Sequence, residues 1–165
     1  MRTLTDAERA ELYFRLWWSH DGQWFLKARD ELGLERAMEL NERSIESMGR
    51  IEMRELHRTL GAPEVTDAAG FLPMAAAVHE LVGLPSKGEM DGPSAFTLGV
   101  HSCPVWPMTE RAGLTESAPG CRGSLRRRLG WASVFFPVDS FRWTRTHGRP
   151  DGNPECGYRF ELRST

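Results

Sequence analysis

Three cysteines carry the most distinctive chemistry of this sequence, and each is expected at the end of an element. Cys103 follows a predicted strand, Cys121 follows Pro-Gly at a predicted helix start, and Cys156 opens the last predicted strand. Ligands at element ends can converge without distorting a core, although the spacing lacks the close C-x-x-C pairs of common zinc ribbons. We therefore expect a metal site made of these cysteines, with zinc as the metal and His147 as the fourth ligand.

The same residues leave other chemistry open. Three cysteines with His147 would form a closed structural shell, whereas three protein ligands and an open position would let metal-bound water attack a substrate. His101 lies two residues before Cys103 and shares its face of the predicted strand, so it could act as a catalytic base that activates this nucleophile. Free cysteine is also among the most buried residue types, so simple packing is the remaining alternative.

Three other side chains are candidates for contact with a small-molecule substrate. Trp24 and Phe25 belong to an aromatic helix face that could line an apolar cavity, although such stripes more often form core. Arg126 opens a run of three arginines that could clamp a carboxylate or phosphate. A charge run is, however, usually a solvated face.

The elements that must position these residues change in character along the chain. The first half has helical periodicity, with Thr5 as N-cap of a helix that we expect to bend near Gly22. A long amphipathic helix follows over 34–60, and a further helix over about 67–82. The polar, turn-rich segment 85–94 is typical of a loop.

The second half alternates with the period of strands. The expected elements are strands over 94–103, 137–147 and 155–164, and short helices within 105–114 and 119–131. The sequence thus predicts an α+β fold, with an N-terminal layer of three to four helices packed on a small antiparallel sheet from the C-terminal half. We expect a single domain over 1–165, comprising a helical subregion at 1–84, the loop at 85–94 and a cysteine-bearing α+β subregion at 95–165.

The composition excludes several kinds of partner. A formal net charge of -2, from 21 basic and 23 acidic residues, gives no field that would attract a polyanion, so we expect no nucleic acid. The N-terminal residues lack the pattern of a signal peptide, and no stretch approaches the roughly 20 apolar residues of a spanning helix. We expect a cytoplasmic protein with no membrane contact, a small molecule as its partner, and a homodimer as a candidate assembly.

Two stretches also resemble a known family. The stretch from Asp21 to Arg58 is similar to the helical signature of L-2-amino-thiazoline-4-carboxylic acid hydrolase-like proteins, a family of small bacterial cytosolic proteins. The matching residues are Asp21, Gly22, Trp24, Phe25, Gly33, Ala37, Ile51, Glu52 and Leu56, with Asn41 in the place of an aspartate, and then Gly148, Cys156, Tyr158 and Phe160. In style the cysteine-bearing half is also distantly similar to 4-vinyl reductase domains, small-molecule-binding modules of which some carry a cysteine-rich zinc site.

The resemblance implies a function. It predicts a hydrolase that opens a cyclic C–N or C–S bond of a thiazoline-like heterocycle, within specialised metabolism and with a cysteine-rich metal site. The departure at Asn41 puts this hydrolase activity in question if the family's aspartate is functional. The alternative is a small-molecule-binding module with a structural zinc site and no catalysis.

Overall fold

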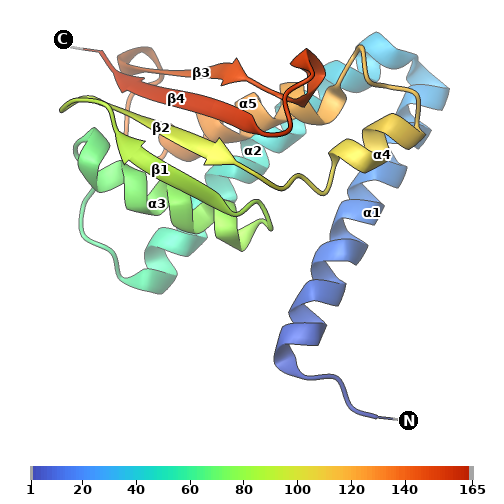
Figure 1. Cartoon of the computed structure of the whole chain (residues 1–165), viewed down its shortest axis with the longest axis horizontal. Coiled ribbons are helices and arrows are strands. Elements are labelled where there is room, and N and C mark those ends of the chain that lie inside the picture. Colours follow the sequence, from blue (N-terminus) through green and yellow to red (C-terminus); the bar gives the residue numbers. More distant parts are fainter. Residues whose placement is uncertain (1, 164–165) are drawn as a thin grey trace. The chain divides into compact units, whose positions relative to one another are not determined.

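A computed structural model describes residues 2–163 and confirms the α+β class (Figure 1). The helices are α1 (Asp6–Leu32), α2 (Leu34–Leu60), α3 (Ala68–Leu81), α4 (Trp106–Arg111) and α5 (Pro119–Ala132). The strands are β1 (Ser86–Met90), β2 (Ala95–Val100), β3 (Phe141–His147) and β4 (Cys156–Leu162), with 3-10 turns at Val138–Ser140 and Arg149–Asp151. The chain divides into two compact units, one up to Leu40 and one from Asn41 onward.

The first unit contains α1 and the start of α2. Thr5 caps α1 with a reciprocal capping box: its hydroxyl accepts from the Glu8 backbone N–H, and the Glu8 carboxylate accepts from the Thr5 N–H. The expected bend near Gly22 is wrong, because α1 is one helix through that residue. A single glycine costs a helix only about 1 kcal/mol, which the surrounding helix-forming residues outweigh. Gly33, with φ of 79°, separates α1 from α2.

The second unit holds an antiparallel sheet of order β1-β2-β4-β3. Segment 85–94, expected to be a loop, contains strand β1, whose residues pair with β2. This strand was missed because it lies at the sheet edge and is exposed, so it shows no apolar alternation, and its charged side chains are typical of an edge. β2 ends at Val100 and not at Cys103, and Val100 pairs with Cys156 of β4.

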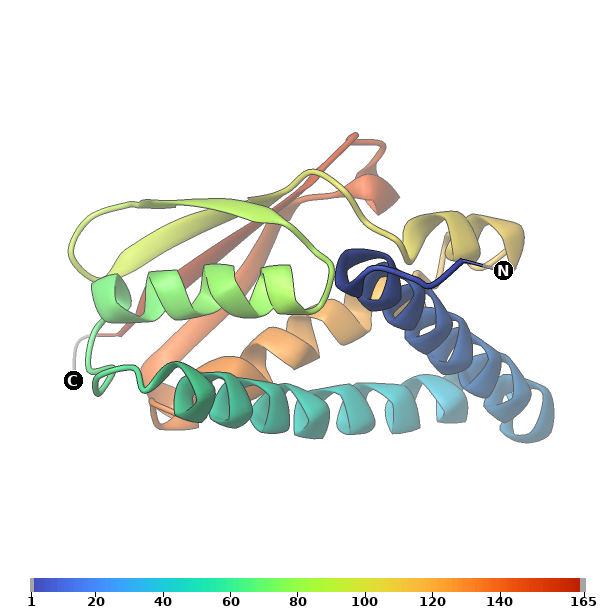
Figure 2. The ribbon, with the colours of Figure 1, turned by 90° about the horizontal axis from the view of Figure 1, so that it is seen from below.

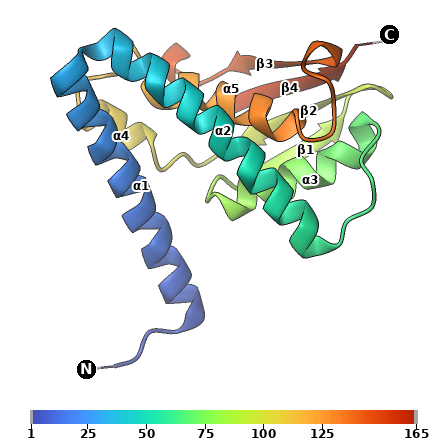
Figure 3. The same ribbon diagram turned by 180° about the vertical axis from the view of Figure 1, so that it is seen from behind.

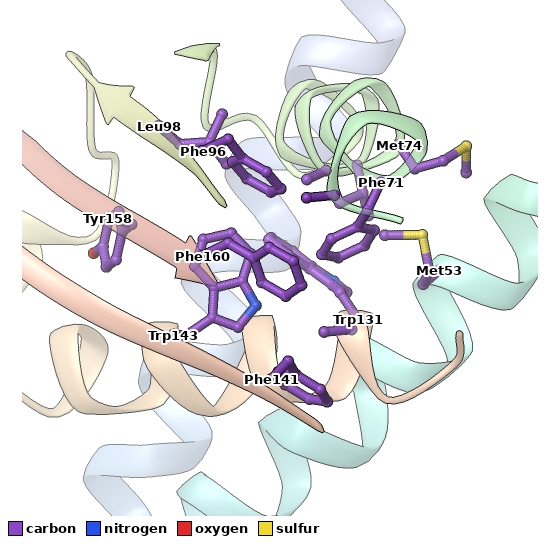
Figure 4. Close-up of a cluster of buried hydrophobic side chains, with 14 of the residues drawn as sticks. Met53, Phe71, Met74, Phe96, Leu98, Trp131, Phe141, Trp143, Tyr158 and Phe160 are labelled. Atoms are coloured by element: carbon purple, nitrogen blue, oxygen red, sulfur yellow. The ribbon is translucent and has the colours of Figure 1, made fainter. Parts of the chain in front are cut away.

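Helices α3 and α5 cover one face of this sheet, and α2 of the second unit lies outside them (Figure 2). Together α3, α5 and the sheet enclose an aromatic core. Phe71 of α3 contacts Phe96, Trp143 and Phe160 from three strands, with ring centroids 5.9, 6.3 and 4.9 Å away (Figure 4). Each helix within residues 2–163 is too short or too polar to cross a bilayer.

Helices α2 and α5 approach closely at two glycines (Figure 3). A Cβ on Gly49 of α2 would overlap the backbone carbonyl of Arg127 on α5, and a Cβ on Gly130 of α5 would overlap the carbonyl of Glu46 on α2. This contact fixes which residues of α5 face α2 and which face α3 and the sheet.

Candidate functional site

Two consecutive arginines of α5 are buried and have different partners. Arg127 is 5 % exposed and forms a two-point ion pair with Glu52 of α2 through Nε and Nη2. The Trp131 indole N–H donates to the same carboxylate at 2.9 Å. The charge of Arg127 is therefore neutralised inside the protein, in the geometry that carboxylates and guanidinium groups favour.

Arg128 is 1 % exposed and points toward α3 and the sheet. Its Nη1 donates to the Ser124 carbonyl at 2.9 Å and to the Ser124 hydroxyl, and its Nη2 donates to His79 Nε2 at 2.6 Å. Its Nε is buried and has no hydrogen-bond partner in the described chain. Within residues 2–163, no carboxylate oxygen lies within 4.0 Å of a nitrogen of the Arg128 guanidinium, so Arg128 forms no ion pair there.

His79 is a neutral hydrogen-bond partner of Arg128. It is fully buried in α3, and its Nδ1 donates to the Ala75 carbonyl at 2.6 Å, which leaves Nε2 as the acceptor for Arg128. Burial, and then the positive charge of Arg128, holds the pKa of His79 well below its ordinary value. The imidazole therefore contributes no charge at neutral pH.

Tyr158 of β4 stacks on the guanidinium. The Arg128 carbon Cζ lies 3.5 Å from the Tyr158 ring centroid, a cation–π contact. The phenol oxygen lies 3.1 Å from the Ser124 hydroxyl, and burial raises the pKa of Tyr158. Tyr158 is therefore also neutral at neutral pH, and it lies at one end of the aromatic cluster (Figure 4).

The structure brings the three thiols together next to this cluster. Cys156 pairs with the last residue of β2, Cys103 lies three residues beyond that end, and Cys121 lies in the first turn of α5. Burial is the main cause that raises the pKa of Cys121 to about 11, and the charges of Cys156 and Cys103 raise it further. Burial also raises the pKa of Cys103, so both thiols are protonated at neutral pH.

The expected metal centre is corrected by the geometry. Over residues 2–163, no group of three or more His, Cys, Asp or Glu side chains is arranged to hold a metal ion. The ring of His147, the expected fourth ligand, packs over Gly157, and its Nε2 lies 4.0 Å from the Glu155 carboxylate. Among residues 2–163 the side chains are thus not arranged as the expected zinc site of Cys103, Cys121, Cys156 and His147.

His101 also contacts Glu155. Its Nδ1 donates to the carboxylate at 2.5 Å, on an exposed part of the surface. The carbonyl of His101 accepts from Arg149 at 3.4 Å. In the expected catalytic pair, His101 is thus hydrogen-bonded to the Glu155 carboxylate. Burial keeps the Cys103 thiol protonated, and a protonated thiol is a poor nucleophile.

Of the three expected substrate-binding residues, one belongs to the second unit and two belong to the first. Arg126 is exposed and forms ion pairs with Glu42 and Glu46 of α2, at 3.3 and 3.6 Å. Trp24 is 49 % exposed and Phe25 is buried; both belong to α1, in the unit up to Leu40.

Sequence reasoning included Arg128 only as one of three arginines that could clamp an anion, and it did not join that residue with His79, Ser124 and Tyr158 into a buried polar cluster. One signal was present in α5. Ser124, Arg128 and Trp131 have the spacing i, i+4, i+7, so they share a helix face with a large apolar residue. A face that contains tryptophan is buried more often than a solvated charge run.

Comparison with known proteins defines the fold further. No known family profile and no curated protein matches the sequence. The phenol-responsive sensory domain of the transcription activator PoxR, solved with phenol, is similar with a TM-score of 0.65 and 18 % identity, over 86 % of this chain and 72 % of that chain. A trafficking protein particle complex subunit 3 from Naegleria fowleri, covalently bound to palmitic acid, is similar with a TM-score of 0.66 and 9 % identity, over 93 % and 97 %. At these identities the similarity shows a shared fold.

The expected metal-binding character is corrected by the geometry, because its ligand set is not assembled among the described residues. The expected hydrolase activity is not tested by the shared fold and stays a prediction. The resemblance to the thiazoline hydrolase-like family is not addressed by either structure and stays a prediction.

Proposed function

We propose that the protein is a small-molecule-binding module that senses or carries its ligand without transforming it. The observation that carries this proposal is the buried polar cluster around Arg128 and Tyr158, at one end of an aromatic core. Small-molecule sites in proteins are lined mostly by apolar and aromatic side chains, with a few polar groups that orient the ligand. The phenol bound by the PoxR sensory domain, which has the same fold, supports a ligand of this size.

The state of the side chains supports binding over catalysis. The thiols of Cys103 and Cys121 are protonated, so neither is an activated nucleophile. The buried histidine of the cluster, His79, uses both ring nitrogens in hydrogen bonds and is neutral. Cys103, Cys121 and His79 are thus not prepared for proton transfer or attack.

Binding is tested by calorimetry and thermal unfolding with small aromatic probes: phenol, benzyl alcohol and benzoate. We expect at least one probe to bind saturably and to raise the unfolding temperature in proportion to its free concentration. Tyr158→Phe removes one buried hydroxyl and should weaken binding about two- to tenfold.

Tyr13→Phe is the matched control, because Tyr13 lies in α1 and is 66 % exposed. It should leave the affinity unchanged. The proposal is contradicted if none of the three probes binds saturably, or if Tyr13→Phe and Tyr158→Phe change the affinity equally.

A further inference from the structure

We infer that Arg128 is the receptor for a carboxylate, and that the ligand is a monoanion with a small apolar body, such as an aromatic carboxylate. This inference rests on the proposed function and names its ligand class. It begins from the contrast within α5: Arg127 meets the carboxylate of Glu52, whereas Arg128, equally buried, meets none within residues 2–163.

Every described partner of Arg128 is neutral. Ser124 and Tyr158 contribute a carbonyl, hydroxyls and a ring face, and His79 contributes an uncharged imidazole nitrogen. A guanidinium stays protonated in proteins, so this one is a buried cation without a counter-charge. Buried charges without partners are strongly unfavourable, and an anion bound beside Arg128 would remove that penalty.

The unpaired Nε indicates how the anion binds. Nη1 and one hydrogen of Nη2 are used by Ser124 and His79, while Nε is buried without a partner. A carboxylate bound side-on would accept from Nε and from the second hydrogen of Nη2. This is the two-point arrangement that makes arginine selective for planar anions.

The side chains around Arg128 favour a ligand with one negative charge and an apolar body. Of the two buried arginines of α5, Arg127 is already neutralised, so the cluster offers a single unmatched positive charge. A phosphate dianion would need more cationic partners than this. The rings of Tyr158 and Trp131 cover the guanidinium at 3.5 and 5.6 Å, and the protonated thiols of Cys103 and Cys121 lie nearby.

The three thiols lie near the cluster. Cys103 and Cys121 are partly exposed, and Cys156 is buried. Cys103 and Cys156 are close enough to influence the pKa of Arg128, and Cys121 and Cys156 are close enough to influence that of Tyr158.

The test compares benzoate with benzamide, which has the same shape and no charge. By calorimetry at fixed ionic strength, we expect benzoate to bind at least about 30-fold more tightly than benzamide, because the charged pair is formed in a buried site. In Arg128→Met this preference should disappear. Arg126→Met, which removes the exposed neighbouring charge, should retain it.

Arg128→Met should fold, because an apolar residue of similar length often replaces a buried charge without loss of stability. Near-UV circular dichroism checks this, and the benzoate–benzamide comparison in the unmodified protein decides the question if the variant does not fold. Arg128→Lys, which keeps the charge but loses the two-point geometry, should show an intermediate preference.

The outcomes separate this inference from the proposed function. If benzamide or phenol binds as tightly as benzoate, the carboxylate inference is overturned and the binding function stands. If inorganic phosphate binds more tightly than benzoate, the ligand class is wrong. If benzoate, benzamide and phenol all fail to bind, the proposed function itself is contradicted.

Discussion

At the scale of single residues, the pair Arg127 and Arg128 shows how one turn of helix can produce two electrostatic environments. Successive residues of a helix point about 100° apart, so Arg127 faces α2 and Arg128 faces α3 and the sheet. Glu52 neutralises the first, and only neutral groups surround the second in the described chain. A cation kept without a partner costs stability, which natural proteins accept most often at functional sites.

The thiols give a prediction for alkaline pH. The pKa of Cys121 is raised in the folded protein from 9.0 to about 11. The stabilisation that the neutral thiol provides is therefore fully present below pH 9 and is lost as the pH rises toward about 11. Urea unfolding should show a steeper loss of stability over this range in the unmodified protein than in Cys121→Ala, which has no thiol to ionise.

Tyr158 titrates in both proteins, and burial, which is the main cause of its raised pKa, is present in both. Equal slopes of unfolding free energy against pH would show that Cys121 is solvated in the folded state.

Sequence reasoning at this scale found the thiols and the run of three arginines, but it did not identify Arg128 as the buried member of that run. The cysteines are rare and distinctive, so their positions at element ends could be deduced from strand and helix boundaries. The role of Arg128 depends on His79 and Tyr158, which are distant in sequence and meet it only in the fold. A run of three arginines cannot show which member is buried until the neighbouring helix is placed.

At the scale of elements, the crossing of α2 and α5 depends on glycine. Gly130→Ala would place a methyl group inside the backbone of α2 at Glu46, where no flexible side chain can move aside. We expect a loss of about 1–3 kcal/mol in the free energy of unfolding, in spite of the better helix propensity of alanine. Chemical denaturation monitored by circular dichroism measures this loss.

Gly70→Ala in α3 is the control for this substitution. Its methyl group would meet the Asp67 side chain at 3.3 Å, and that side chain would need to give by only a few tenths of an ångström while it accepts its cap bond from the Gly70 N–H. This variant should therefore lose far less stability than Gly130→Ala. If both variants are equally stable, α2 and α5 do not pack as closely as described.

Most elements were predictable for physical reasons that are local. Thr5 with Glu8 set the start of α1, the apolar spacing set α2, and Asp67 capped α3. Strand β1 was not predictable in this way, because Ser86–Met90 acquires its structure from pairing with β2 and not from an apolar pattern of its own.

At the scale of the whole molecule, Phe71 connects the layers of the second unit. Its ring contacts the rings of Phe96 and Phe160 on adjacent strands and of Phe136 after α5. Phe71→Ala should lower the free energy of unfolding by about 3–5 kcal/mol, because it opens a cavity at the centre of the core. It should also weaken the near-UV circular dichroism signal of the packed aromatic rings.

Leu81→Ala at the end of α3 removes an exposed apolar side chain and should cost far less. Comparable losses in the two variants would mean that Phe71 is not at the centre of the packing. The homodimer stays a prediction that light scattering on the full chain can test.

The order of the strands in the sheet has a consequence for folding of the nascent chain on the ribosome. β4 lies between β2 and β3, yet it is translated after both. Until residues 156–162 emerge, the nascent β1–β2 hairpin has an unpaired inner edge, and Phe96 lacks its stacked partner Phe160. Such edges are prone to wrong pairing. The interval between translation of β2 and β4 is therefore when the nascent chain is most exposed to wrong strand pairing.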